Sequence, residues 1–279
     1  MKVIASIVTF NPEQERLKQN IDAICQQVDE IVIVDNGSSN IEDIQSLVSS
    51  YTNIHCIFNN ENLGIATALN KAAKYAHSQA YEWIITLDQD SVAPYNLVKT
   101  YAQYADASKI GMLCCKIVDR NFGELEEQKH HAHGIEEVPM CITSASMMNL
   151  KAWHAVGGFC DEMFIDSVDF DICLSMREDG YKIIKVNDVS LLHEVGHSEI
   201  RHFLGKERQI YHHSPIRYYY MVRNGIYLGQ RHHFTLRALY RVSRMAFFTI
   251  LFDDNKMKKL KMMSKGYLHA LIHKYGKLK

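Results

Sequence analysis

The 279-residue sequence has no C-x-x-C pair, although it has seven cysteines. An odd number of cysteines without paired spacing is typical of reduced thiols in a cytosolic protein and argues against a disulfide framework. We interpret all of them as small, buried hydrophobic side chains. They are Cys25, Cys56, Cys114, Cys115, Cys141, Cys160 and Cys173.

Long apolar runs are also absent. No window approaches the roughly 20 apolar residues that a membrane-spanning helix needs. The short apolar stretch at residues 1–6 soon gives way to the polar Asn11-Pro12-Glu13, so we expect it not to be a signal peptide. The chain has no internal repeat, and its 47% apolar and 23% charged content is close to globular averages. We therefore expect a folded cytoplasmic protein with one main domain and an appendage.

The net charge of −1 gives no general reason to expect a nucleic-acid partner. Residues 231–279 differ, because they hold twelve Lys and Arg against two Asp, a local charge of +10. An apolar stripe accompanies these cations, formed by Phe234, Leu239, Val242, Met245, Phe248 and Phe252. Such a helix suits an anionic membrane surface, here the inner face of the cell membrane, but a helix packed on the main domain explains the pattern equally well.

Apolar runs at residues 3–9, 31–34, 54–58 and 83–87 alternate with helix-period segments at 13–27, 41–50 and 66–75. This alternation predicts an α/β fold with a mostly parallel, Rossmann-like sheet covered by helices. From Ser214 onwards the sequence predicts helices. Ligands of parallel sheets bind at the carboxyl ends of the strands. The polar residues at 9–11, 35–38, 59–64 and 88–90 should therefore lie along one edge.

Two of these polar segments suggest chemistry. Asp88 and Asp90, spaced D-x-D after a buried strand, can share a divalent cation with a diphosphate. A turn after a strand also often contains Asp, so the pair alone leaves both interpretations open. Asp35 can accept a hydrogen bond from the imide N–H of uracil or thymine, or it can simply belong to a strand-to-helix turn. No glycine-rich phosphate loop occurs, so a nucleotide would depend on a base pocket and a metal.

Five ordered motifs together carry a family resemblance. They are Val8-Thr9-Phe10-Asn11, Ile33 to Ser38 (IVDNGS), Asn59 to Asn70 (NNENLGIATALN), Leu87 to Ser91 (LDQDS) and Phe164 to Asp171 (FIDSVDFD). The set resembles the family 2 glycosyltransferases, and most closely their bacterial rhamnosyltransferase-like branch. That branch also shows the His-Ser-Pro and Tyr-Tyr-x-x-Arg-Asn sequences found here at 213–215 and 219–224.

The resemblance implies a GT-A domain over residues 1–230, followed by a basic helical appendage at 231–279. It also implies an inverting transfer of a sugar from a nucleotide diphosphate with Mg²⁺ or Mn²⁺ as cofactor. The implied donor is dTDP-rhamnose, with a UDP-hexose or UDP-galactofuranose as the alternative. The implied acceptor is a saccharide or lipid-linked glycan in bacterial surface polysaccharide synthesis.

The resemblance also assigns site residues. Asp169 is the implied general base, and Asp166 and Asp171 are implied to bind the acceptor. The implied metal ligands are Asp90 and His193. The implied nucleotide-sugar contacts are Thr9, Asn11, Asp35, Asn62, Gly64 and Asp88. Each of two assignments has a plainer alternative. His193 can be a buried or capping histidine, since most histidines are not metal ligands. The three acids at 166–171 can simply complement the dipole of a helix that begins there.

Two other functions fit parts of the sequence. Residues 88–92 also match the D-x-D-x-[TV] nucleophile motif of haloacid-dehalogenase-like phosphohydrolases, although three predicted strands precede them here. A catalytically idle scaffold for glycan enzymes is the non-enzymatic alternative. Phosphatase and donor-hydrolysis measurements distinguish these functions.

Overall fold

The computed structural model describes residues 1–119, 123–124, 133–193, 198–203, 206–211 and 213–278. The chain divides into two compact units. The first unit contains residues 1–164 and 168–193, and the second contains residues 165–167 and 194–279. The predicted boundary at residue 230 falls inside the second unit and stays a prediction.

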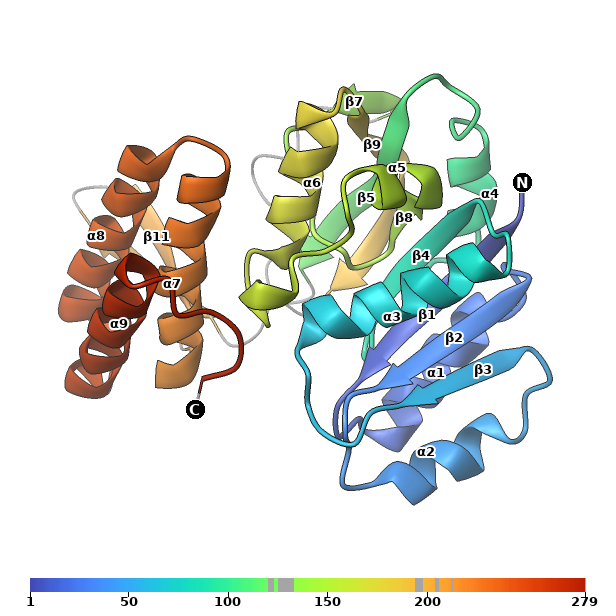
Figure 1. The fold of residues 1–279 in the computed structure, drawn as a ribbon, viewed down its shortest axis with the longest axis horizontal. Helices are drawn as coiled ribbons and strands as arrows, with labels where there is room; N and C mark the ends of the chain where they lie inside the picture. The colour runs from blue at the N-terminus through green and yellow to red at the C-terminus, as the bar shows by residue number, and fades with distance from the viewer. Residues whose placement is uncertain (120–122, 125–132, 194–197, 204–205, 212, 279) are drawn as a thin grey trace. The chain divides into compact units, whose positions relative to one another are not determined.

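A single large sheet organises the first unit (Figure 1). Its strand order is β3-β2-β1-β4-β8-β5-β9-β7, and β6 pairs with β5. The strands are β1 (Val3–Thr9), β2 (Glu30–Asp35), β3 (Ile54–Phe58), β4 (Trp83–Asp88), β5 (Ile110–Asp119), β6 (Gly123–Glu124), β7 (Ile135–Glu137), β8 (Ser146–Asn149) and β9 (Lys182–His193). The helices are α1 (Gln14–Ile24), α2 (Ile41–Val48), α3 (Ile65–Ser78), α4 (Leu97–Ala102), α5 (Leu150–Ala155), η2 (Asp161–Met163) and α6 (Val168–Glu178).

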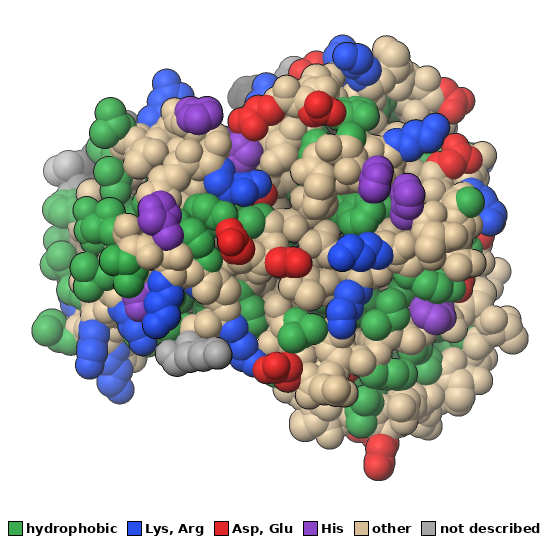
Figure 2. All heavy atoms as spheres, viewed as in Figure 1, with side chains coloured by type: hydrophobic (Ala, Val, Ile, Leu, Met, Phe, Trp, Pro, Cys, Tyr) green, Lys and Arg blue, Asp and Glu red, His purple; other side chains and the backbone are tan. Residues whose placement is uncertain are grey.

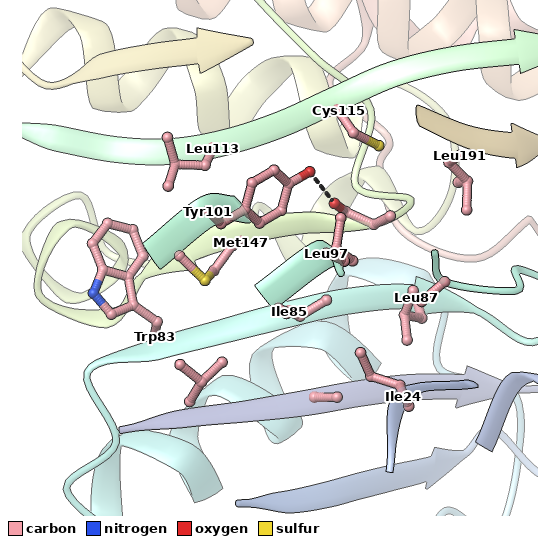
Figure 3. Close-up of a cluster of buried hydrophobic side chains, with 14 of the residues drawn as sticks. Ile24, Trp83, Ile85, Leu87, Leu97, Tyr101, Leu113, Cys115, Met147 and Leu191 are labelled. Atoms are coloured by element: carbon pink, nitrogen blue, oxygen red, sulfur yellow. Dashed lines mark hydrogen bonds between the residues drawn. The ribbon is translucent and has the colours of Figure 1, made fainter. Parts of the chain in front are cut away.

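The strand sequences explain why this sheet is buried. All seven residues of β1 are buried, as are five of the six in β2 and in β4. Strands covered by helices on both faces need near-continuous apolar runs, which these segments have. Figure 3 shows the core on one face, where Trp83, Ile85 and Leu87 of β4 lie beside α4. Tyr101 of α4 satisfies its hydroxyl there by donating to the carbonyl of Ala145 at 2.7 Å.

The predicted α/β fold is confirmed, with an addition that the sequence pattern did not reveal. Strands β3, β2, β1 and β4 are parallel, as expected, and β5 is parallel to β9. Between them lies β8, which is antiparallel to both β4 and β5. This strand is only four residues long and leads directly into α5, so it is too short to show a period of its own.

The second unit consists of a hairpin and three helices. The hairpin pairs β10 (Ser198–Phe203) with β11 (Lys206–Tyr211). The helices are α7 (Pro215–Arg231), α8 (Thr235–Phe252) and α9 (Lys256–Leu271). Tyr218, Val222 and Ile226 form a stripe at four-residue spacing on α7, which packs with Met263 and Ala270 of α9. The helical C-terminus predicted from the sequence is therefore present.

Candidate active site

The ends of three adjacent strands bring the first predicted residues together. Thr9 at the end of β1 is paired in register with Asp35 at the end of β2. On the other side of β1, Val8 is paired with Asp88 at the end of β4. The loops that follow these strands, and the loop after β3, therefore leave the sheet along one edge, as the sequence predicted.

Asp35 lies at the centre of this edge and is fully buried. Its carboxylate accepts hydrogen bonds from the Thr9 hydroxyl at 2.9 Å and from the backbone N–H groups of Gly37 and Ser38 at 3.1 and 2.9 Å. The Ser38 hydroxyl donates a fourth bond. Because a carboxylate offers about four acceptor positions, a base could bond to Asp35 only by replacing one of these donors. The base contacts of Thr9 and Asp35 stay predictions.

A network of amide side chains shapes the loop after β3. Asn36 donates to the side-chain oxygen of Asn62 and to the carbonyl of Gly64, both at 3.2 Å. The side-chain oxygen of Asn36 accepts from Asn59 at 3.1 Å and from the Leu63 N–H at 3.0 Å. Asn62 in turn accepts from the Gly64 N–H at 2.9 Å. This loop is therefore held rigidly against the end of β2. Asn11 is tied to the same edge, because its side-chain oxygen accepts from the Ser39 N–H at 2.8 Å.

Gly64 joins this loop to the acidic segment that begins at Phe164. Its φ is +90°, and a Cβ on it would lie 2.5 Å from the carbonyl oxygen of Phe164. The next residue, Ile65, donates its N–H to that same carbonyl at 2.7 Å. The predicted nucleotide loop and the start of the predicted acceptor segment are thus in direct contact in the first unit.

We expect Gly64→Ala to destabilise the protein by more than the left-handed backbone alone costs, which is about 1–2 kcal/mol for a residue with a Cβ. The extra cost comes from the clash with Phe164. Gly157→Ala is the matched control, because its φ is +83° but nothing lies within 4 Å of its Cβ position. Urea unfolding of both variants measures the difference. Equal losses of unfolding free energy would show that the contact with Phe164 is loose.

The D-x-D pair has two different environments. Asp88 accepts a hydrogen bond from the Ser144 hydroxyl, and its backbone carbonyl accepts from the Asn20 side chain at 2.7 Å. Asp90 is exposed. Within the described part of the chain its carboxylate has neither a hydrogen bond nor an ion pair, and only its backbone carbonyl is held, by Arg16 at 3.2 Å. Asp90 thus presents, among the described residues, a carboxylate without a partner on a positioned loop.

These donors fit a hard divalent cation. Mg²⁺ and Mn²⁺ prefer carboxylate oxygens, and Mg²⁺ commonly takes one or two of them plus substrate phosphates. No group of three or more His, Cys, Asp or Glu that could hold a metal occurs among the residues that the structure describes. His193 ends β9, and its side chain lies outside the described part, so its role as a ligand stays a prediction.

The acidic segment has an unusual backbone. Phe164, Asp166 and Ser167 all have left-handed φ values, between 63° and 67°. Such strain persists only where the surroundings impose it, and it is concentrated at functional sites. Asn224 of α7 helps to impose it by donating to the backbone carbonyls of Ile165 and Asp166 at 2.5 and 3.0 Å. This contact gives a structural role to the end of the Tyr-Tyr-x-x-Arg-Asn sequence.

The three acids of this segment differ in exposure. Asp166 is largely buried and pairs with Arg217 at 3.2 Å. Burial raises the pKa of the Asp166 carboxyl, and the Arg217 guanidinium offsets part of that shift. Asp169 is half-buried in the first turn of α6, whereas Asp171 is almost fully buried. Of the three, Asp169 is the one that combines access to solvent with a position in the first turn of α6.

Two residues at this edge belong to no motif that the sequence reveals. Ser144 contacts Asp88 from just before β8, across 56 residues of sequence. Asn20 projects from α1, where it occupies a buried position otherwise expected to be apolar. Their roles depend on tertiary contacts, so only the structure could identify them.

A family model described as Glycosyl transferase family 2 matches residues 5–166, which include both the D-x-D pair and the nucleotide loop. The chain belongs to this family. The match excludes the phosphohydrolase interpretation of residues 88–92, and in the structure Asp88 ends the fourth strand along the chain. The protein is therefore a glycosyltransferase with a GT-A fold.

Relatives and solved structures agree with this assignment. The dTDP-rhamnosyl transferase RfbF of Shigella flexneri is 28% identical over 283 residues, covering 96% of this chain and 94% of the relative. The structure of S. aureus TarS 1-349 in complex with UDP-GlcNAc matches with a TM-score of 0.65 and 15% identity, covering 97% of this chain and 81% of that one. GalNAc-T7 with UDP, GalNAc and Mn²⁺ matches with a TM-score of 0.58 and 14% identity, covering 73% of this chain and 44% of that one.

Within the described residues, no helix has the length and hydropathy that crossing a bilayer requires.

Proposed function

We propose that this glycosyltransferase moves rhamnose from dTDP-rhamnose to a saccharide or lipid-linked glycan acceptor in bacterial surface polysaccharide synthesis. The observation that carries the proposal is the similarity to the dTDP-rhamnosyl transferase RfbF, which extends over nearly the whole of both chains. A match of that extent includes the acceptor-side segments as well as the nucleotide edge.

The donor would bind at the edge formed by β1, β2 and β4. Thr9 and Asp35 would contact the base, Asp88 would lie near the ribose, and Asn11, Asn62 and Gly64 would line the nucleotide loop. The rigid hydrogen bonding around Asp35 and Asn36 supports this arrangement, since a preorganised pocket loses little entropy on binding.

Mg²⁺ or Mn²⁺ would be held by Asp90 and His193. When bound, the cation neutralises charge on the diphosphate and so makes it a better leaving group. The exposed carboxylate of Asp90, which has no partner in the part of the chain that the structure describes, supports the assignment.

Asp169 would act as the general base, and Asp166 and Asp171 would help to position the acceptor. The acceptor hydroxyl oxygen attacks the anomeric carbon as the bond from that carbon to the diphosphate oxygen breaks. The hydroxyl proton passes to the Asp169 carboxylate, and dTDP leaves with the electron pair of the broken bond. Attack opposite to the leaving group inverts the anomeric configuration.

Calorimetric titration tests the donor assignment. We expect dTDP-rhamnose to bind more tightly than UDP-galactofuranose or UDP-hexoses in the presence of Mg²⁺ or Mn²⁺. Tighter binding of a UDP-sugar would replace the rhamnose proposal with the alternative donor class and leave the family assignment intact.

A further inference from the structure

The apolar stripe singled out in the basic C-terminal segment lies largely inside the helical unit. Leu239, Val242 and Met245 of α8 pack against the cluster that α7 and α9 form. These residues pack on α7 and α9 of the same unit, so they are largely unavailable to lipid, although Leu239 and Val242 also line the groove described below. Lys259 is likewise unavailable, because it is buried and donates to the carboxylates of Asp253 and Asp254.

A second apolar stripe lies on the outward side of α8. Its five members are between 40% and 84% exposed, and all fall within about 100° of one another around the helix axis at 100° per residue. They are Leu236, Tyr240, Phe247, Ile250 and Leu251. A helix of a water-soluble bundle normally turns its polar side outward, so this stripe needs a partner.

Helix α9 adds a matching apolar surface. Four apolar side chains of α9, and a fifth just after the helix ends, are between 39% and 80% exposed. They are Met257, Tyr267, Leu268, Leu271 and Ile272. An open groove of about 580 Å³ runs between the two helices, with residues such as Val242, Ala246 and Leu268 along its walls. Figure 2 shows hydrophobic side chains gathered over these C-terminal helices. We call the two stripes and the groove the α8–α9 face.

Cations border this face. Arg237, Arg241 and Arg244 are exposed on α8, each one or a few residues from a member of its apolar stripe. On α9 the exposed cations are Lys256, Lys258 and Lys261. The only acids in residues 231–279 are Asp253 and Asp254, and both are paired with Lys259. The face is therefore apolar at its centre and cationic at its margin.

We propose that the α8–α9 face binds the surface of an anionic bilayer, with both helices lying in the interfacial plane. Apolar side chains would enter the headgroup boundary while the bordering cations pair with lipid phosphates. A second copy of the chain fits less well, because a twofold contact of this face with itself would bring arginines and lysines together without acids to pair them. The proposal does not depend on the identity of the donor sugar.

Vesicle flotation of the 279-residue protein tests the proposal, using phosphatidylcholine vesicles with and without phosphatidylglycerol at low salt. We expect the wild type to float with the anionic vesicles and to be released by high salt. Leu236→Glu/Ile250→Glu should lower the apparent binding constant at least about tenfold. Arg237→Gln/Arg241→Gln/Arg244→Gln should lower it at least about tenfold on anionic vesicles only.

The controls change the same residue types away from the face. Tyr95→Glu alters a side chain that is 90% exposed in the first unit, and Lys74→Gln/Lys109→Gln/Lys151→Gln removes three exposed cations there. Both controls should bind vesicles like the wild type. Absence of flotation with anionic vesicles, or equal losses in the controls, would overturn the proposal. A dimer that Leu236→Glu/Ile250→Glu abolishes, without any vesicle binding, would assign the face to a second copy instead.

Discussion

Changing Asp169 to Asn is expected to lower turnover by at least about a hundredfold while donor affinity stays near that of the wild type. Positioned base catalysis typically contributes about 10²- to 10⁴-fold, and Asn keeps the shape of the side chain but cannot take the proton. The structure places Asp169 half-exposed in the first turn of α6. The same helix start follows the strained segment that contacts the nucleotide loop through Phe164.

Asp166→Asn is the matched comparison. Asp166 is buried, its pKa is raised by that burial, and it already pairs with Arg217. We therefore expect its replacement to weaken acceptor binding, seen as a higher KM for the acceptor, more than it lowers kcat. Single-turnover rates and donor titrations on both variants separate these effects. Normal turnover in Asp169→Asn together with a large loss in Asp166→Asn would identify Asp166 as the base.

Replacing Asp90 with Ala is expected to abolish metal-dependent donor binding without unfolding the protein. Asp90 is exposed and its carboxylate supports no contact within the described chain, so removing it should cost little folding energy. A diphosphate bound through a cation, by contrast, loses one of the two protein ligands proposed for that cation. Asp88 is poorly placed to take over as the metal ligand, because its carboxylate already accepts a hydrogen bond from the Ser144 hydroxyl.

Donor titrations with Mg²⁺, with Mn²⁺ and with a chelator measure this effect. Asp106→Ala, which removes another exposed carboxylate of the first unit, is the control and should bind donor like the wild type. If Asp90→Ala binds donor and metal normally, the cation is held elsewhere and the D-x-D assignment is wrong.

The parallel part of the fold could be predicted because its strands are buried on both faces and are therefore almost uniformly apolar. Their order along the chain also placed the four polar loops on one edge, which the parallel pairing of β1 with β2 and β4, and of β2 with β3, confirms. Strand β8 could not be predicted, because its four residues continue directly into α5 and give no separate period.

The local contacts of the site were beyond the sequence for a different reason. The motif around Asp35 located the residue, but only the structure shows that its carboxylate is already saturated by Thr9, Gly37 and Ser38. Helix α8 presents a similar ambiguity, since it has two apolar stripes and periodicity alone cannot decide which one packs inward. The contact with α7 and α9 decides it.

The most direct test of the proposed function is the initial rate of donor cleavage by the 279-residue protein with Mg²⁺ or Mn²⁺. The rate would be compared among dTDP-rhamnose, UDP-galactofuranose and UDP-hexoses, each with and without a saccharide acceptor. We expect dTDP-rhamnose to be cleaved fastest, with release of dTDP that stops when a chelator removes the metal. Faster cleavage of a UDP-sugar would contradict the rhamnosyltransferase assignment, and no cleavage of any donor would favour a catalytically idle scaffold.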